Sequence, residues 1–190
     1  MEKQQALNKL RSLGYLSAAC CKQFLDSAVL IRKEYGQFIT RPGREADKLW
    51  FIAEGLVKAY YLNKNNRERI IHFTKEDEFM FDSYLFFHEK KYPYYIQCLE
   101  NCVFVEINFS AVKELMQSYP EYCLVNAKVC GLVNKKAVIR SKILNKEEGS
   151  FKYQAFLKYH PYHHRISRED LCQYLNLSKS RLRHIIHESK

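Results

Sequence analysis

The decapeptide KSRLRHIIHE near the C-terminus gathers side chains that could bind a nucleic acid. At about 100° per residue in a helix, Ser180, Arg183 and His184 fall on the side opposite Leu182 and Ile185. An arginine fork pairs with the edge of guanine in the major groove, and hydroxyl and imidazole groups can also bond base edges. The helix would thus present one polar face, which includes Ser180, Arg183 and His184, to a nucleic acid.

The first turn of the same helix carries positive charge. Lys179 and Arg181 lie at the positive end of the helix dipole, where acidic residues would be stabilising. A bound phosphate would relieve this cost. The side chains expected to contact the DNA backbone are Ser167, Ser178, Lys179, Arg181 and His187. The alternative is a basic helix that only faces solvent.

A second, preceding helix is needed to position this one. Ser167 followed by Asp170 is a capping pattern, because the hydroxyl accepts the Asp170 amide proton while the carboxylate reaches back. Asn176 adopts the left-handed conformation cheaply, which suits a tight turn between helices. Ser178 can then cap a helix that runs from Lys179 to about Glu188. The segment predicts a helix-turn-helix.

The overall charge agrees with a polyanionic partner. The 190 residues carry a formal net charge of +10, and 47% of them are hydrophobic, which suffices for one large or two small domains. A mildly basic enzyme can show the same charge excess. Charge alone therefore leaves a nucleic-acid-binding protein and an enzyme both open.

The cysteines and the N-terminal stretch favour a cytoplasmic protein. The seven cysteines are scattered and form no CxxC pair, so we interpret them as reduced thiols. The adjacent Cys20 and Cys21 point about 100° apart on a helix and favour core packing over an iron–sulfur cluster. Charges interrupt the apolar residues near the N-terminus, and we expect no export signal or membrane span.

The first two thirds of the chain change from helical to β texture. Residues 4–33 have helical spacing and predict two short helices. Five short β-rich runs then follow, separated by turn formers such as Arg41-Pro42-Gly43. These runs cover residues 49–52, 56–62, 69–73, 94–99 and 103–107. Their spacing predicts an antiparallel sandwich or barrel.

A long helix after the β region carries a candidate pairing seam. The seam positions alternate in steps of four and three, and only Lys136 among them is polar. They are Val125, Val129, Leu132, Lys136, Ile139 and Ile143. Such a pattern is expected of a helix that pairs with another helix, so we expect a homodimer. The alternative is that this face packs on the chain's own β domain.

The stretch LWFIAEGLVKAY at residues 49–60 resembles the aromatic-rich strand, glycine turn and strand of the Crp/Fnr family of bacterial transcription regulators. The likeness continues through residues 79–83, 94–100 and 178–184, and it is most similar to the Bacteroidetes branch. The resemblance implies an α+β fold with an antiparallel β jelly roll (a double-stranded β-helix), a long dimerisation helix and a C-terminal helix-turn-helix. It also implies a DNA-bound dimer with recognition helices in successive major grooves, and RNA polymerase as a further partner if the protein activates transcription. Within this resemblance, Ser180, Arg183 and His184 occupy the positions that usually read base edges of double-stranded DNA.

The resemblance further implies a division of the chain. The β-barrel sensory domain would cover residues 1–117, the dimerisation helix residues 118–147 and the DNA-binding domain residues 148–190. The family usually has a β wing after the recognition helix. This sequence ends at Lys190, so whether a full wing is present stays an open question.

The sensing region departs from the family pattern. Cyclic-nucleotide binders of the family use a Gly-Glu pair for the ribose and a nearby Arg-Ser or Arg-Thr for the phosphate, whereas this sequence has Phe81-Asp82 and then Tyr92-Pro93-Tyr94-Tyr95. Burying a phosphate without a cation is costly. We therefore expect no cyclic AMP binding in the family manner and assign no cofactor. The remaining candidate pocket residues are Phe81, Asp82, Ser83, Tyr94 and Tyr95, with Asp82 also a candidate loop cap.

Two rival classes remain. A cupin-like metal enzyme would need converging histidines, and His72 and His88 are the only histidines before residue 150. We therefore expect no enzyme and no metal site. The second rival is a sensory or scaffolding module that binds protein, with a basic tail that attracts any nucleic acid.

Overall fold

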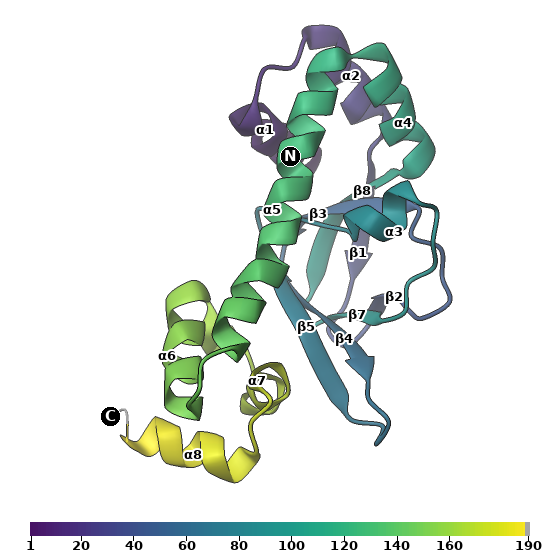
Figure 1. Ribbon diagram of the computed structural model, residues 1–190. Coiled ribbons are helices and arrows are strands. Elements are labelled where there is room, and N and C mark those ends of the chain that lie inside the picture. Colours follow the sequence, from purple (N-terminus) through teal and green to yellow (C-terminus); the bar gives the residue numbers. More distant parts are fainter. Residues whose placement is uncertain (189–190) are drawn as a thin grey trace. The chain divides into compact units, whose positions relative to one another are not determined.

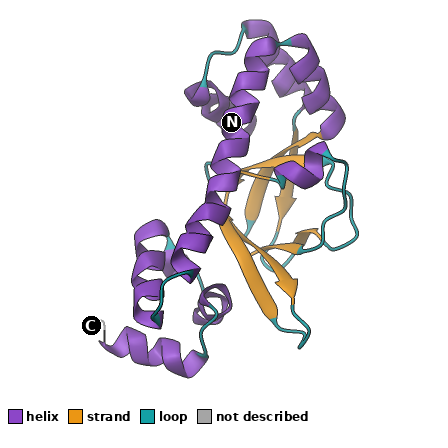
Figure 2. Cartoon of the chain, viewed as in Figure 1, coloured by secondary structure: helices purple, strands orange, loops and turns teal. Residues whose placement is uncertain are grey.

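Two four-stranded β-sheets and a long helix organise the chain, and the computed structural model describes residues 1–188 of it (Figures 1 and 2). The strands are β1 (Val29–Lys33), β2 (Phe38–Thr40), β3 (Lys48–Glu54), β4 (Leu56–Leu62), β5 (Glu68–Lys75), β6 (Glu78–Met80), β7 (Tyr95–Cys98) and β8 (Cys102–Asn108). The helices are α1 (Glu2–Leu13), α2 (Ala18–Ser27), α3 (Ser83–Phe87), α4 (Phe109–Ser118), α5 (Pro120–Leu144), α6 (Gly149–Tyr159), the 3₁₀ turn η1 (His163–Arg165), α7 (Arg168–Leu175) and α8 (Lys179–Glu188). The predicted α+β class is confirmed.

The first sheet has the order β1-β8-β3-β6 and is buried on both faces at its centre. Successive side chains of a strand point to opposite faces. Leu49 and Phe51 of β3 therefore pack with α1, α2 and α4 in the main hydrophobic core, while Trp50 and Ile52 are buried on the other face. This double burial explains why β3 reads as a continuous apolar run.

The second sheet has the order β2-β7-β4-β5. The turn that leads into β4 depends on Gly55, whose φ is 98°. A Cβ atom at this position would lie 2.7 Å from the Asn101 carbonyl oxygen and would crowd the Cys102 sulfur. Glycine is therefore the residue that fits this turn.

Three strands were not recognisable as strands in the sequence. Residues 4–33 were predicted to be helical, but β1 occupies the last five of them and pairs antiparallel with β8. Pairing with a central strand outweighs a local helical pattern. β2 and β6 are three residues long, which is too short for alternation to show. The five β-rich runs match β3, β4, β5, β7 and β8, and their prediction is confirmed.

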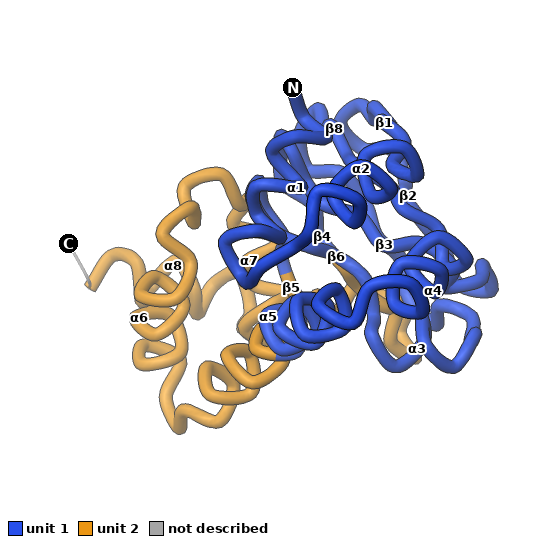
Figure 3. The backbone as a smooth tube through the Cα atoms, turned by 90° about the horizontal axis from the view of Figure 1, so that it is seen from above, with its two compact units in different colours: residues 1–58, 73–134 blue, residues 59–72, 135–190 orange. Residues whose placement is uncertain are grey.

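The residues form two compact units, which are shown in different colours in Figure 3. Unit 1 comprises residues 1–58 and 73–134 and contains the first sheet and the N-terminal helices. Unit 2 comprises residues 59–72 and 135–190, so it joins the outer part of the β4–β5 hairpin to the C-terminal half of α5 and to the helices that follow. Among residues 1–188, no helix has the length and apolar character needed to cross a membrane.

Candidate nucleic-acid interface and sensory pocket

Helices α7 and α8 form the predicted helix-turn-helix. The Ser167 hydroxyl accepts the amide proton of Asp170 at 3.0 Å and donates to its carboxylate at 2.6 Å. Asn176 has φ 55° and ψ 41°, which is the left-handed conformation expected at the turn. The Ser178 hydroxyl accepts the Arg181 amide proton at 3.2 Å. Both predicted caps and the left-handed turn are confirmed.

Helix α8 has one buried and one exposed face. Leu182 and Ile185 are each 1% exposed and hold the helix against its neighbours. Ser180, Arg183 and His184 lie exposed on the other face, as their spacing predicts. Arg183 forms no ion pair with any residue of the described range 1–188. The structure therefore brings the three candidate base-reading side chains together on one exposed surface.

The candidate backbone contacts differ in their surroundings. The Lys179 ammonium lies 2.8 Å from the Glu169 carboxylate, and this hydrogen-bonded ion pair raises the pKa of Lys179. Ser167, Ser178, Arg181 and His187 are exposed. His184 is also engaged, with its Nε2 atom 3.1 Å from the carboxylate of Glu188. The Glu169 carboxylate is thus the anion that lies beside the first turn of α8.

Arg168 is a candidate that the sequence reasoning missed. It lines a surface cavity of about 230 Å³ between α7 and α8 together with Glu169, Lys179 and Arg183. Three cationic side chains therefore surround one depression beside the helix pair. The position of Arg168, directly after the Ser167 cap, is the feature of the sequence that could have indicated it.

The predicted seam on α5 is largely covered by the chain itself. Val125 and Val129 belong to the main hydrophobic core with the N-terminal helices, and Ile143 is fully buried. At these three positions the seam packs within the chain, as the alternative to a dimer seam predicted. Ile139 is half-buried, and Leu132 is 41% exposed.

A different face of α5 is exposed. Leu124 is 71% exposed and Val138 is 53% exposed, and Gly131 lies midway between them with seven residues to each. No side chain or backbone atom outside its own helix turn lies within 4 Å of a Cβ built on Gly131. A spacing of seven keeps residues on one line along a helix that pairs with another.

The candidate sensory pocket is filled by the chain's own groups. One carboxylate oxygen of Asp82 accepts the amide proton of Leu85 at 3.0 Å and so caps α3, while the other accepts the Tyr94 hydroxyl at 3.3 Å. Phe81 is buried with its ring 5.3 Å from that of Phe86. The candidate role of Asp82 as a loop cap is confirmed.

Ser83 and Tyr95 lie apart from this arrangement. The Ser83 hydroxyl bonds the Asn134 side chain at 3.2 Å, and the Tyr95 ring lies 5.8 Å from that of Phe38. Tyr95 is the first residue of β7 and Tyr94 directly precedes it, but their side chains point in different directions. The structure therefore places Phe81, Asp82 and Tyr94 together and separates Tyr95 from them.

Tyr92 occupies the interior beside Asp82. Its ring packs 5.3 Å from Tyr94 and 6.4 Å from Trp50, and its hydroxyl has no hydrogen-bond partner within residues 1–188. Burial, followed by the nearby Asp82 carboxylate, raises the pKa of Tyr92 well above its ordinary value. Tyr92 and Tyr94 thus place aromatic side chains beside the Asp82 carboxylate.

Arg140 connects three elements within unit 2. Its Nε–H donates to the Ile70 carbonyl oxygen of the β4–β5 hairpin at 3.0 Å, and its guanidinium carbon lies 5.6 Å from the centre of the Tyr174 ring in α7. Tyr174 is 1% exposed and packs against Phe156 and His160 of the helix pair's supporting core. Arg140 of α5 therefore contacts both the β4–β5 hairpin and helix α7 of the helix-turn-helix.

His72, on the same hairpin, is held neutral. Burial, followed by the positive charges of Lys136 and Arg140, lowers its pKa to about 3. At neutral pH this imidazole adds no charge beside the arginine.

The comparisons with known proteins agree with this architecture. Residues 31–119 match the cyclic nucleotide-binding domain. No curated protein sequence matches the chain. Among solved structures, the chain is similar to the c-di-GMP responsive global regulator CLP of Xanthomonas campestris, with 18% identity, a TM-score of 0.72, and coverage of 90% of this chain and 91% of that one.

Two further structures give the same result. FixK2 from Bradyrhizobium japonicum has 13% identity and a TM-score of 0.74, with 85% of this chain and 83% of that chain covered. A Crp/Fnr family transcriptional regulator from Eubacterium rectale has 12% identity and a TM-score of 0.72, with coverage of 91% and 83%.

The β region that matches the cyclic nucleotide-binding domain is thus followed in the chain by a long helix and a helix-turn-helix. The chain's structural neighbours are transcription regulators of the Crp/Fnr family, so the resemblance to that family is confirmed at the level of the fold. The similarity to the Bacteroidetes branch stays a prediction, and a β wing after α8 would fall on residues outside the described range.

Proposed function

We propose that this protein is a dimeric, sequence-specific DNA-binding transcription regulator of the Crp/Fnr type, acting in the cytoplasm and not as an enzyme. The observation that carries the proposal is the exposed polar face of α8, with Ser180, Arg183 and His184 opposite the buried Leu182 and Ile185. A recognition helix needs this division between a face that packs and a face that reads. Arg183 is the principal base reader, because no carboxylate within residues 1–188 pairs with its guanidinium.

The DNA backbone contacts come from the edges of the helix pair. Ser167, Ser178, Arg181 and His187 are exposed and can reach phosphates, as can Arg168. Lys179 joins them only when a phosphate replaces Glu169 as its partner. The division into a sensory region (residues 1–117), a dimerisation region (118–147) and a DNA-binding region (148–190) is kept in this proposal.

The dimer contact is proposed on the exposed line of α5. Leu124 and Val138 supply apolar surface, and Gly131 between them permits close approach of a second helix. Leu132 and Ile139 border this line, whereas the buried Val125, Val129 and Ile143 stabilise the protomer. Sedimentation tests the assignment: Leu124→Glu with Val138→Glu should yield monomers. Tyr15→Glu, at an exposed hydrophobic position elsewhere in the chain, should not.

Cyclic nucleotides are not proposed as effectors in the family manner. Asp82 already bonds the Leu85 amide and the Tyr94 hydroxyl, and the buried Tyr92 brings no charge to meet a phosphate. Displacing these groups would cost their mutual hydrogen bonds and expose aromatic surface. RNA polymerase is the expected partner if the regulator is an activator.

Selection against a random duplex library near physiological salt tests the DNA-binding proposal. The protein should enrich a roughly palindromic motif, and the Arg183→Ala, His184→Ala variant should lose it. Lys113→Ala, which removes an exposed charge from α4, serves as the control and should retain the motif. Equal, salt-sensitive binding of all duplexes by every variant would instead support a protein-binding module with a basic tail.

A further inference from the structure

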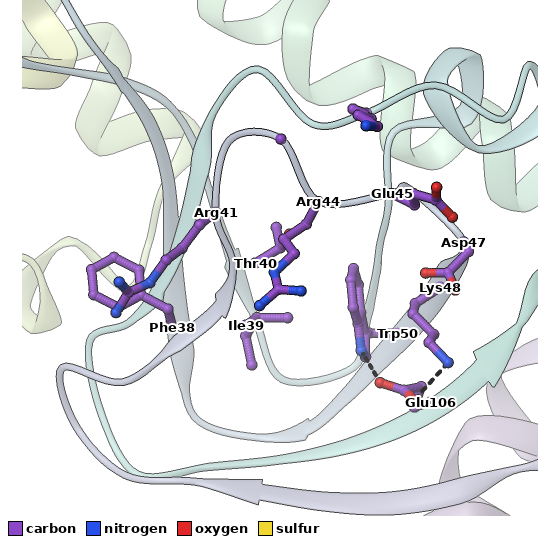
Figure 4. A pocket seen from close by; sticks show the side chains of 12 residues that line it. Phe38, Ile39, Thr40, Arg41, Arg44, Glu45, Asp47, Lys48, Trp50 and Glu106 are labelled. Carbon is purple, nitrogen blue, oxygen red and sulfur yellow. Dashed lines mark hydrogen bonds and ion pairs between the residues drawn. The ribbon is translucent and has the colours of Figure 1, made fainter.

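A surface cavity of unit 1 lies outside both sites described so far. It has a volume of about 670 Å³ and lies between β2, the loop that follows it, and the start of β3 (Figure 4). Its principal lining side chains are Phe38, Arg41, Arg44, Lys48, Trp50 and Glu106. None of these residues belongs to the pocket region at Phe81 and Asp82.

Two arginines of this cavity have no acidic partner among residues 1–188. The Arg41 guanidinium lies 4.2 Å above the centre of the Phe38 ring. Arg44 directs its guanidinium into the space between Ile39 and Trp50, as Figure 4 shows. Within residues 1–188, no carboxylate or other acceptor contacts the Arg44 guanidinium. These two fork-shaped cations are free to bind an anion.

The carboxylates of the lining do not neutralise these arginines. Glu106 accepts the Trp50 indole N–H at 2.8 Å and lies 3.5 Å from the Lys48 ammonium, so its charge is already balanced. Glu45 and Asp47 lie at the end of the cavity away from Arg41 (Figure 4). The end between Phe38 and Trp50 therefore combines positive charge with aromatic walls.

This combination defines a ligand class. A guanidinium pairs best with the planar oxygens of a carboxylate or with a phosphate, and rings at the wall favour an apolar or aromatic portion of the same molecule. We propose that this cavity binds a small molecule that joins an aromatic ring to a phosphate or carboxylate group, with Arg44 and Arg41 holding the anion. The site does not depend on DNA binding, and its occupancy would act on the β2–β3 loop.

Trp50 makes the proposal directly measurable, because it is the only tryptophan of the chain. Its indole lines the cavity, so a ligand that binds there should change its fluorescence. The full-length protein is titrated with phenyl phosphate and benzoate, which carry a ring and an anion. Inorganic phosphate tests the anion alone, and phenol tests the ring alone.

The expected result is a saturable change in Trp50 fluorescence with phenyl phosphate or benzoate, and much weaker changes with inorganic phosphate and phenol. Arg44→Gln should weaken the binding about tenfold or more, because a charge-assisted hydrogen bond is lost. Arg44 is exposed, so the substitution leaves the core intact. Lys33→Gln, which removes a charge from β1 outside this cavity, should bind as the unaltered protein does.

Three outcomes would overturn the proposal. They are the absence of a saturable change with either aromatic anion, equal affinity in Arg44→Gln, and equal binding of phenol. Two-dimensional NMR of the Trp50 indole N–H provides a second readout, since its bond to Glu106 lies at the cavity wall. A shift of this resonance by phenyl phosphate that persists unchanged in Arg44→Gln would also contradict the assignment.

Discussion

Arg140 should hold the β4–β5 hairpin and the helix-turn-helix in one cooperative structure. Replacing it by alanine removes the hydrogen bond to the Ile70 carbonyl oxygen and the contact with the Tyr174 ring. A hydrogen bond from a charged donor contributes about 1.5–3 kcal/mol, and a partly exposed cation–π contact about 0.5–1 kcal/mol. Because Arg140 is half-buried, we expect the lower part of this range, about 2 kcal/mol.

Hydrogen exchange measures this loss locally. If the hairpin and α7 open together, 2 kcal/mol corresponds to an increase of about thirtyfold in the exchange rate of their protected amides. The increase should cover residues 59–72 and the amides around Tyr174, and should leave the first sheet of unit 1 unchanged. Local exchange is preferred to a single melting temperature, because a chain with two compact units need not unfold in one step.

Two matched variants make the result specific. Lys142→Ala removes an exposed charge from the same helix and should change little. Arg140→Lys retains a cation near the ring but lacks the Nε–H, so its effect should be intermediate. Equal exchange in Arg140→Ala and Lys142→Ala would refute the reasoning, as would faster exchange confined to the hairpin with α7 unaffected.

The remaining predictions concern the turn, the ion pair and the hairpin histidine. Asn176→Val should destabilise unit 2 by about 1–2 kcal/mol, because a β-branched residue resists the left-handed conformation. Asn176→Gly should be tolerated. Chemical denaturation monitored by a probe in unit 2 compares the stability of the two variants. Glu169→Gln should release Lys179 and so tighten binding to every duplex. The dependence of the DNA affinity on salt concentration should become steeper by about one released counterion. An unchanged dependence would mean that Lys179 does not contact the DNA. His72 has a folded-state pKa of about 3, below its value when unfolded. The unfolded chain therefore takes up the proton first, stability falls as the pH drops from about 6.5 toward 3, and His72→Gln should reduce this acid sensitivity in denaturation curves.

The helix-turn-helix was predictable because its determinants are local. The Ser167 cap, the left-handed Asn176 and the Ser178 cap each act within three or four residues of the chain. The same holds for Asp82 as a cap of α3. Such contacts are fixed by short sequence spacing, so the sequence alone identifies them.

Contacts between elements were not predictable in this way. Lys179 meets Glu169 from a different helix, and Arg140 reaches a backbone carbonyl seventy positions earlier in the chain. A backbone acceptor leaves no trace in the side-chain pattern. The cavity beside Trp50 likewise depends on how β2, β3 and β8 pack, and no motif in the sequence marks it.

Helix α5 shows the physical limit most clearly. Periodicity identifies residues that share a face, but it does not identify what covers that face. Val125 and Val129 belong to the more hydrophobic line, and the main hydrophobic core that they share with the N-terminal helices buries them. Leu124, Gly131 and Val138 form a second line one residue out of step, and it is exposed. Because the stronger pattern is already buried within the protomer, we place the proposed dimer contact on the weaker, exposed line.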